Sequence, residues 1–357
     1  MAKYYFVSLK GLSVRIMLAA VLYGKRDLRL EDRPLPALKP DEVILKIEYA
    51  AICGTDIHLF NGSAPAKYPV ILGHEYAGRV FRVGENVREF RPGDRVIGAY
   101  LSSCGKCEFC IKGKPQLCMR RKMFGINIDG CFAQYMRIPN PERTLIKIPD
   151  NVDLRDAVLI PDMFLTAAYA VERSVKLGDT VLIIGLGAIG LSTVIAAKQA
   201  GTGKIIASSR SERLLSMAKE LGAEYTINYG HERLIDKVRR ITGGLGVDVA
   251  IETSGKATTA KLAFEATKPG GTYVQVGIIT QPVQLDFRYL TGLERSIIGV
   301  LNPASPNYMK KMLTSSMKTM NLIRKLVTHE FKLEEINEAI NIAENKIGNP
   351  IKILIKI

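Results

Sequence analysis

The stretch TVLIIGLGAIGLSTVIAAKQAG, residues 180–201, decides the fold of this chain. A β-branched run is followed by glycines in the pattern GxGxxG and then by an Ala-rich apolar run. This order predicts a buried strand, a tight turn and a buried helix. In that context the motif predicts a dinucleotide site, with a pyrophosphate at the amide groups of the helix N-terminus. The six motif residues are Gly185, Leu186, Gly187, Ala188, Ile189 and Gly190.

Strand and helix patterns keep alternating after this stretch. The further β-type runs are KIIASS, YTINY, VDVAIETSG and TYVQVGI, at residues 204–209, 225–229, 247–255 and 272–278. Alternation of this kind predicts a parallel sheet with helices on both faces. We therefore predict an α/β chain with a Rossmann doubly wound domain at residues 166–302. The uncharged run 180–197 is long enough for a membrane helix, but its glycines favour strand, turn and helix, so no membrane partner is expected.

The residues after the second strand bear on the choice of coenzyme. NAD sites usually present Asp or Glu about 20 residues after the glycine motif, where it bonds the ribose 2′-hydroxyl. Ser208, Ser209 and Arg210 stand there instead. The serines leave room and hydroxyl donors for a 2′-phosphate, and the arginine offers a charge-assisted contact. The pattern favours NADP over NAD; the alternative is that Arg210 is a solvated loop residue and NAD binds.

Four cysteines crowd into a short segment before this domain, in the pattern CxxCxxCx7C. Four thiolates at this spacing suit a tetrahedral zinc ion, and a closed set of four leaves no position for substrate. We predict a structural zinc that ties down the loop of residues 99–130. An iron–sulfur cluster or disulfides remain alternatives, because spacing alone does not choose the metal. The ligands would be Cys104, Cys107, Cys110 and Cys118.

A second set of candidate ligands is spread along the chain. Residues 17–98 carry short β-type runs separated by turn residues, which predict an antiparallel, barrel-like domain. The motifs CGTDIH and GHE from this region, and PDM after it, supply Cys53, His74, Glu75 and Asp162. A thiolate, an imidazole and a carboxylate suit a catalytic zinc. Spacing alone does not bring them together, and singly they read equally well as a buried Cys, a core His and a helix-capping Asp.

Taken together, these motifs resemble a known family. CGTDIH, GHEYAG, RPGDRV, the four-cysteine cluster, GLGAIG and LVTHEF occur in the order found in zinc-dependent medium-chain alcohol dehydrogenases, from about residue 17 onward. The resemblance implies a GroES-like β-rich catalytic domain at residues 1–165, completed by residues 303–357 after the Rossmann domain. It also implies a catalytic zinc in the cleft between the domains and a homotetramer, with a dimer as the alternative.

The resemblance assigns a role to each motif residue. Cys53, His74 and Asp162 match the catalytic-zinc ligands, and Glu75 matches a neighbouring carboxylate that can join or leave the metal. Many relatives have Cys at the third position, and Asp there resembles the NADP-dependent secondary alcohol dehydrogenases. The remaining matches are Thr55, which touches the substrate oxygen; His58, which passes protons to solvent; Asp56, which supports a ligating histidine; and Thr253, Val276 and Ile278, which line the coenzyme.

Composition sets outer limits on function. The chain has 357 residues, 47% apolar and 24% charged, which is long enough for two cores and too apolar for disorder. Its net charge of +15 comes from scattered residues and favours a basic surface over nucleic-acid binding. A zinc-containing nucleic-acid-binding protein is the rival from another class, but it would leave GLGAIG and CGTDIH unused. No nucleic-acid partner is expected.

The first sixteen residues and the thiols bear on location. Residues 1–16 lack a secretory apolar core, and they are either an extension or a mis-called start. Clustered free thiols favour a reducing compartment, so we predict a cytoplasmic protein.

The predicted activity is hydride transfer between a small alcohol, with a secondary alcohol favoured, and NADP(H), giving a ketone or aldehyde. About two Zn²⁺ per chain are expected. Polyol, sugar and L-threonine dehydrogenases of the same superfamily share every motif and remain alternatives. The run FGINIDG at residues 124–130 is reminiscent of threonine dehydrogenases.

Overall fold

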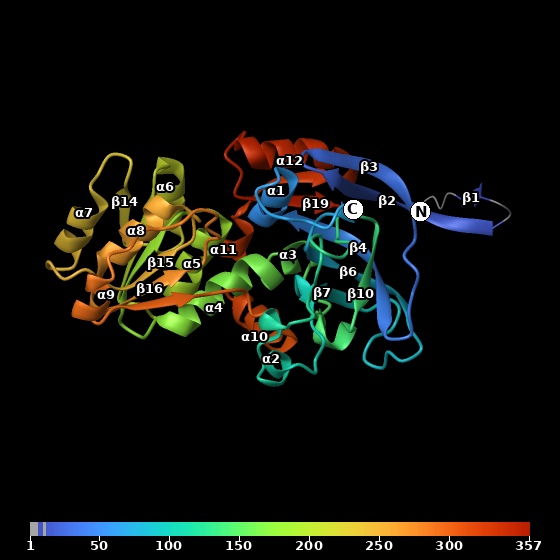
Figure 1. Cartoon of the computed structure of the whole chain (residues 1–357), viewed down its shortest axis with the longest axis horizontal. Helices are drawn as coiled ribbons and strands as arrows, with labels where there is room; N and C mark the ends of the chain where they lie inside the picture. Colours follow the sequence, from blue (N-terminus) through green and yellow to red (C-terminus); the bar gives the residue numbers. More distant parts are fainter. Residues whose placement is uncertain (1–5, 10–11) are drawn as a thin grey trace. The chain divides into compact units, whose positions relative to one another are not determined.

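The computed structural model describes residues 6–9 and 12–357, and the chain divides into two compact units (Figure 1). Unit 1 comprises Met1–Asp162, Pro303–Met317 and Val327–Ile357, and unit 2 comprises Met163–Asn302 and Lys318–Leu326. The resemblance implies catalytic-domain bounds of 1–165 and 303–357, whereas the structure groups residues 163–165 and 318–326 with unit 2. Of the first sixteen residues, 1–5 and 10–11 lie outside the described part.

Unit 2 is built on a six-stranded parallel sheet. Its strands are β12 (Thr180–Ile184), β13 (Lys204–Ser209), β14 (Tyr225–Asn228), β15 (Val247–Glu252), β16 (Thr267–Gln275) and β17 (Ser296–Gly299). The order across the sheet is β14-β13-β12-β15-β16-β17, and every neighbouring pair is parallel. This is the doubly wound Rossmann order, and it confirms the predicted fold class. The short strand β17 was not among the predicted strands.

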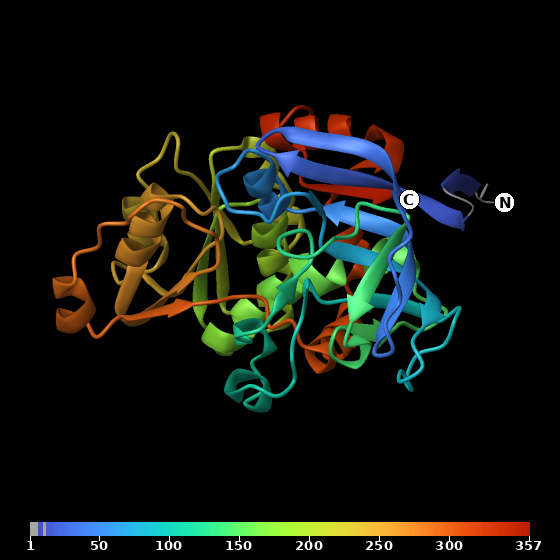
Figure 2. The same ribbon diagram turned by 45° about the vertical axis from the view of Figure 1, so that its right-hand side comes forward.

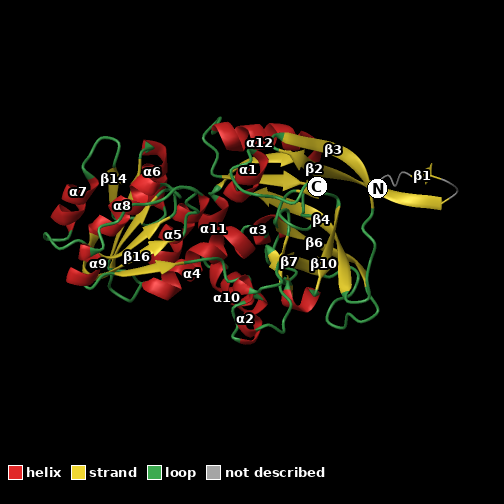
Figure 3. Ribbon diagram, in the orientation of Figure 1, coloured by secondary structure: helices red, strands yellow, loops and turns green. Residues whose placement is uncertain are grey.

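The helices of unit 2 connect and cover these strands (Figure 3). They are α4 (Leu165–Ser174), α5 (Ala188–Gln199), α6 (Glu212–Glu220), α7 (Leu234–Ile241), α8 (Ala257–Ala266), α9 (Arg288–Gly292) and α11 (Met320–Arg324). Helix α5 is buried from Gly190 to Ala197, because it is apolar all round and packs inside the domain. The uncharged run of the sequence is therefore a core strand and a core helix.

Unit 1 is mainly antiparallel β structure. Its strands are β1 (Phe6–Leu9), β2 (Leu12–Gly24), β3 (Asp27–Pro34), β4 (Glu42–Ile52), β5 (Val70–Ile71), β6 (Glu75–Val83), β7 (Arg95–Gly98), β8 (Leu101–Ser102), β9 (Lys122–Met123), β10 (Tyr135–Pro139), β11 (Leu145–Lys147), β18 (Val327–Lys332) and β19 (Lys352–Lys356). One sheet has the order β11-β7-β6-β4-β19-β18, with β10 also on β4. A second sheet has the order β1-β2-β3, with β5 on β2.

Strand β19, at the C-terminal end of the chain, pairs antiparallel with β4 from the N-terminal part, and Ile353 lies opposite Ile52. Figure 2 shows this red strand beside the blue ones. The helices of unit 1 are α1 (Gly54–Phe60), α2 (Glu108–Ile111), α3 (Leu154–Ala157), α10 (Pro306–Ser316) and α12 (Ile336–Asn345), with short 3₁₀ turns η1 (Pro115–Leu117), η2 (Pro141–Arg143) and η4 (Leu333–Glu335). A π-helical turn, η3 (Ile160–Phe164), carries Asp162. Leu45, Ile336 and Ile353 belong to one core cluster, so the returning segment completes the core of unit 1.

Candidate metal and coenzyme sites

Cys53, His74, Glu75 and Asp162 come together in unit 1. Each offers one ligand atom, and these atoms all lie within 4.8 Å of one another. Cys53 Sγ is 3.7 Å from Asp162 Oδ2, although the two residues are 109 positions apart. The fold thus brings together residues from three separate segments of the sequence, whose spacing along the chain does not predict that they meet.

The ends of two paired strands place these side chains. Strand β4 ends at Ile52, so Cys53 follows it as the N-cap of α1. Strand β6 begins at Glu75, which lies opposite Ala51 of β4. Asp162 reaches the cluster from the π-helical turn η3, an element that occurs mostly as short bulges at functional sites.

Asp56 supports two of the candidate ligands from a fully buried position. Its Oδ2 accepts a hydrogen bond from the backbone N–H of Cys53 at 2.8 Å, and its Oδ1 lies 3.2 Å from His74 Nδ1. A carboxylate beside one ring nitrogen fixes the orientation of a metal-binding histidine and leaves the other nitrogen for the metal. The geometry supports the role that the resemblance assigns to Asp56.

The donor set of this cluster fits zinc. Thiolate, imidazole and carboxylate are the ligand types of catalytic zinc sites. Burial and the negative charge of Asp162 raise the pKa of the Cys53 thiol above its ordinary value. A divalent cation held by these residues would offset both effects, because metal binding favours the deprotonated ligand.

A lysine that the motifs did not select joins the cluster. Lys352 on β19 is buried, and its Nζ donates to Glu75 Oε1 at 2.6 Å and Oε2 at 2.7 Å and to the Ile52 carbonyl at 3.3 Å. Burial lowers the pKa of Lys352, but the negative charges of Glu75, Cys53 and Asp162 and the hydrogen bonding to Glu75 together outweigh it, so the net shift of the pKa is upward. The sequence signal for this residue was one of the two lysines that flank the apolar run of the terminal strand, KILIK.

Thr55 and His58 lie on α1, directly after Cys53. Thr55 Oγ1 is 3.8 Å from Cys53 Sγ, so the hydroxyl borders the ligand cluster. His58 is half-buried, and its Nδ1 lies 2.9 Å from Ser63 Oγ. An imidazole that is held on one side and partly open on the other suits proton exchange with solvent.

The four clustered cysteines form a second group whose ligand atoms all lie within 4.8 Å of one another. All six cysteines of the chain lie in the described part and are free thiols. Cys107 Sγ and Cys110 Sγ are 3.6 Å apart, which is too far for a disulfide. Zinc–sulfur bonds of about 2.3 Å in a tetrahedron separate the sulfurs by about 3.8 Å, so the spacing fits zinc.

Backbone and side-chain donors surround these sulfurs. The backbone N–H of Cys104 points to Cys118 Sγ at 3.3 Å, and Arg120 Nη2 lies 3.6 Å from Cys104 Sγ. Hydrogen bonds from the backbone N–H of Lys106 first, and from the backbone of Cys107 and the neighbouring thiols, together lower the pKa of Cys104 to about 6. Donors of this kind stabilise thiolates, the form in which cysteine binds metal.

The glycine motif forms the turn between β12 and α5. Gly185 has φ +92°, a conformation that side chains rarely adopt. A Cβ on Gly190 would lie 1.8 Å from the Gly185 carbonyl oxygen, whereas a Cβ on Gly187 would meet nothing within 4 Å. Gly190 is therefore required by the packing of the turn, and Gly187 faces open space at the N-terminus of α5.

The three predicted coenzyme-binding residues at the end of β13 differ in burial and in their hydrogen bonds. Ser208 is fully buried and its Oγ donates to the Ile227 carbonyl at 3.0 Å, so the predicted hydroxyl donor at this position is used inside the fold. Ser209 Oγ accepts a hydrogen bond from the Ser211 N–H at 3.2 Å. Arg210 is exposed. Ser209 is 7% exposed, so of the three predicted residues Arg210 has the most accessible side chain.

The weaker coenzyme predictions fall on the neighbouring strand ends. Thr253 Oγ1 donates to the Gly185 carbonyl at 2.5 Å, which ties it to the glycine turn. Val276 is half-buried, and Ile278 is 60% exposed. Glu252, which no motif selects, is buried at the end of β15 and accepts hydrogen bonds from the backbone N–H groups of Ser254 and Gly255 in the following loop. Its signal in the sequence was an acid that ends the strand VDVAIE directly after the apolar residues VAI.

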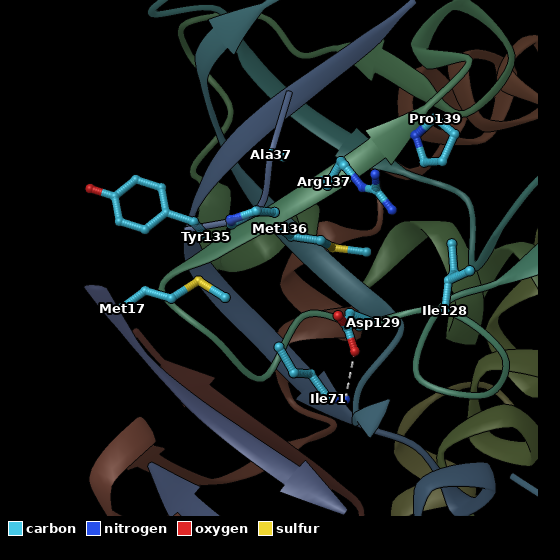
Figure 4. Close-up of a pocket in the computed structure, with 11 residues that line it drawn as sticks. Met17, Ala37, Ile71, Ile128, Asp129, Tyr135, Met136, Arg137 and Pro139 are labelled. Atoms are coloured by element: carbon cyan, nitrogen blue, oxygen red, sulfur yellow. Dashed lines mark hydrogen bonds between the residues drawn. The ribbon is translucent and has the colours of Figure 1, made fainter. Parts of the chain in front are cut away.

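A separate cavity of about 240 Å³ lies in unit 1 and is lined in part by residues of β2, β5 and β10. Figure 4 shows Met17, Tyr135 and Arg137 among its lining residues, with Asp129 Oδ1 accepting from the Ile71 N–H at 3.1 Å. None of the predicted site residues is among those that line it.

Comparison with known proteins identifies the family. Residues 39–150 match the model of the alcohol dehydrogenase GroES-like domain, and residues 188–317 match that of zinc-binding dehydrogenase. A sorbitol dehydrogenase of Halalkalibacterium halodurans is 33% identical over 336 residues, covering 93% of this chain and 96% of that protein. The chain belongs to the zinc-dependent medium-chain alcohol dehydrogenase family. It is therefore an oxidoreductase, as the motifs predict.

Solved structures of related proteins agree. One from Sinorhizobium meliloti, bound to NADP, is 30% identical with a TM-score of 0.86, covering 96% of this chain and 99% of its own. An alcohol dehydrogenase from Escherichia coli, complexed with NADH, is 29% identical with a TM-score of 0.88 over the same shares. Within the part of this dehydrogenase that the structure describes, every helix is too short or too polar to cross a bilayer.

Proposed function

We propose that this dehydrogenase interconverts a small alcohol, with secondary alcohols preferred, and its ketone or aldehyde using NADP(H). The observation that carries the proposal is the meeting of Cys53, His74 and Asp162 within one cluster. In this proposal unit 1 is the catalytic domain and unit 2 binds the coenzyme.

Cys53, His74 and Asp162 would hold a zinc ion, with Glu75 beside it. Zinc bound there would act as a Lewis acid that lowers the pKa of a substrate hydroxyl. The Thr55 hydroxyl, next to Cys53 Sγ, would orient the substrate oxygen and relay its proton, accepting it while donating its own through the coenzyme ribose toward His58. His58, half-exposed and held by Ser63, would release that proton to solvent.

The glycine turn would bind the coenzyme pyrophosphate at the N-terminus of α5. A nicotinamide coenzyme bound there would accept or donate the hydride. Ser209 and Arg210 support NADP, because a hydroxyl and a guanidinium suit a 2′-phosphate and no carboxylate opposes it. The Sinorhizobium and Escherichia coli relatives carry NADP and NADH respectively, so the choice rests on these two residues.

A polyol is the second candidate substrate, favoured by the 33% identity to a sorbitol dehydrogenase. A spectrophotometric screen of secondary alcohols, polyols and threonine with both coenzymes separates the two. We expect the highest kcat/KM for a secondary alcohol with NADP; a higher value for a polyol would favour the second candidate.

Two substitutions test the metal ligands. Cys53→Ser and His74→Ala should abolish turnover because each removes a ligand, while NADPH binding to unit 2 survives. Equilibrium NADPH titration and kinetics measure the two effects separately. A variant that keeps near wild-type turnover would contradict the assignment of these residues as zinc ligands.

Substitution Ser209→Asp tests the coenzyme assignment. The new carboxylate would repel a 2′-phosphate and could bond a ribose 2′-hydroxyl, so the NADP/NAD ratio of kcat/KM should fall by about tenfold or more. The matched control is Ser211→Asp, which places the same charge two residues later. An unchanged ratio in the Ser209 variant would refute the argument from this position.

We further propose a homotetramer in the cytoplasm. Six free thiols suit a reducing compartment, and the resemblance supports the tetramer. Light scattering coupled to size-exclusion chromatography measures the oligomeric state directly; a monomer would contradict the proposal.

A further inference from the structure

Unit 2 contains a cavity of about 310 Å³ that lies apart from the glycine turn. The end of α7, the loop before β15, the start of β16 and the segment between α9 and β17 line it. These strands therefore begin at the cavity, whereas the glycine turn follows the end of β12. Because the strands of this sheet are parallel, the cavity and the glycine turn lie at opposite edges of it. A coenzyme at the turn would leave the cavity free.

The cavity combines apolar side chains with charged ones, as sites for small organic molecules do. One of the apolar residues, Leu245, is 67% exposed, so it is open to contact with a ligand. The apolar side chains that line the cavity are those of Ile235, Val238, Leu245, Pro269 and Leu293.

The charged residues that line the cavity are Arg239, Glu265 and Arg295. Two positive charges thus stand against one negative charge. Glu265 also lies 3.8 Å from Lys261 on the same helix, which draws part of its charge away from the two arginines. One positive charge in the cavity is left without a counterion among the lining residues, so the cavity suits an anion with a single charge.

Arg295 is held in place but incompletely bonded. Its Nη2 donates to the Thr267 carbonyl, and its guanidinium carbon lies 5.9 Å from the ring centroid of Tyr289. Within residues 6–9 and 12–357, its buried Nε has no hydrogen-bond partner. Burial is the main cause that lowers the pKa of Arg295, and the charge of Arg239 adds to it. Glu265 and Tyr289 raise the pKa without reversing the shift. An anion beside this guanidinium would offset the cost of burying its charge.

We propose that this cavity is a second ligand site, which binds a small organic acid with one carboxylate and an apolar body. The carboxylate would pair with Arg239 and Arg295, because planar guanidinium groups match the two oxygens of a carboxylate. The apolar body would contact Leu245 and the other apolar lining residues. The site belongs to unit 2 alone, so it depends neither on the metal ligands nor on the proposed reaction.

The test is equilibrium dialysis of radiolabelled octanoate against the zinc-loaded enzyme in saturating NADPH, which keeps the coenzyme site occupied. Arg239→Glu reverses one charge of the cavity at an exposed position. Arg240→Glu is the matched control, because Arg240 is exposed and lies in the same last turn of α7 but does not line the cavity. Both variants place the same charge at the C-terminus of this helix, so the cavity is what distinguishes them.

We expect Arg239→Glu to weaken octanoate binding by about tenfold or more, and Arg240→Glu to stay within about twofold of wild type. Octanamide has a similar shape without the charge and should bind about tenfold more weakly than octanoate or worse. Arg295→Met should also lose binding; if that variant does not fold, Arg239→Glu still decides. Cys53→Ser should bind octanoate as wild type does, because the cavity contains no metal ligand.

Four results would overturn the proposal. The first is a wild type that binds no octanoate. The second is an equal loss of binding in Arg239→Glu and Arg240→Glu, which would show a general effect of surface charge. The third is octanamide that binds as tightly as octanoate, which would remove the role of the arginines. The fourth is loss of octanoate binding in Cys53→Ser, which would place the acid at the metal site of unit 1.

Discussion

Two substitutions in the glycine turn should separate packing from coenzyme binding. A methyl group on Gly190 would sit 1.8 Å from the Gly185 carbonyl and 2.8 Å from Thr253 Oγ1, so Gly190→Ala forces α5 away from β12. Overpacking of this kind costs about 1–3 kcal/mol. Because the nearest atom is backbone, we expect the upper end, which lowers the melting temperature of a domain this size by roughly 6–12 °C.

Gly187→Ala is the contrasting change. Its Cβ would meet nothing within 4 Å, and the backbone there, with φ −74° and ψ −167°, accepts alanine. The free energy of unfolding should change by no more than about 0.5 kcal/mol. The methyl group would occupy the space where a pyrophosphate approaches the backbone, so NADPH affinity should fall by about tenfold or more.

The assay is thermal unfolding without coenzyme, followed by fluorescence titration with NADPH. Gly292→Ala, another glycine of unit 2 with open space around it, controls for the substitution itself and should change neither quantity. The reasoning is refuted if Gly187→Ala lowers the melting temperature as much as Gly190→Ala, or if it binds NADPH as tightly as wild type.

Other predictions concern the metal sites of unit 1. Cys107→Ser should lose one zinc per chain and expose residues 99–130 to protease, because the ion holds that loop; metal analysis and limited proteolysis measure this, and an unchanged cleavage pattern would count against a structural zinc. Asp56→Asn should weaken zinc binding at the Cys53 cluster by about 10–100-fold, because the carboxylate beside His74 Nδ1 is lost. Competition with a chelator gives the affinity, and equal affinity would exclude this supporting role.

Local signals in the sequence predicted most of the fold of unit 2. The β-type runs and the glycine motif gave β12 to β16 in order, because each strand and helix carries its own apolar pattern. Strand β17 has no clear sequence signal, because SIIG is a four-residue edge strand whose residues are exposed except for the half-buried Ile298. Helix α11 was assigned to the other domain because sequence position alone does not show which core a helix packs against.

The candidate sites show the same difference between features that local sequence predicts and features that depend on tertiary packing. The four clustered cysteines were predictable from spacing, because a metal site within fifteen residues is a local feature. Cys53, His74 and Asp162 needed a family resemblance, since their meeting depends on strand pairing between distant segments. Lys352 had no motif, and Ser208 looked available because its hydrogen bond to Ile227 depends on the neighbouring strand β14.

The spread of the ligands along the chain implies an order of metal capture during biosynthesis. Cys104 to Cys118 lie within one short loop, so a nascent polypeptide can close around zinc as soon as that loop leaves the ribosome, at small entropic cost. The Cys53 cluster exists only when residue 162 has been made and β4 and β6 have paired. Its ammonium neighbour arrives later still, on β19, so cellular zinc should reach the two centres at different moments of maturation.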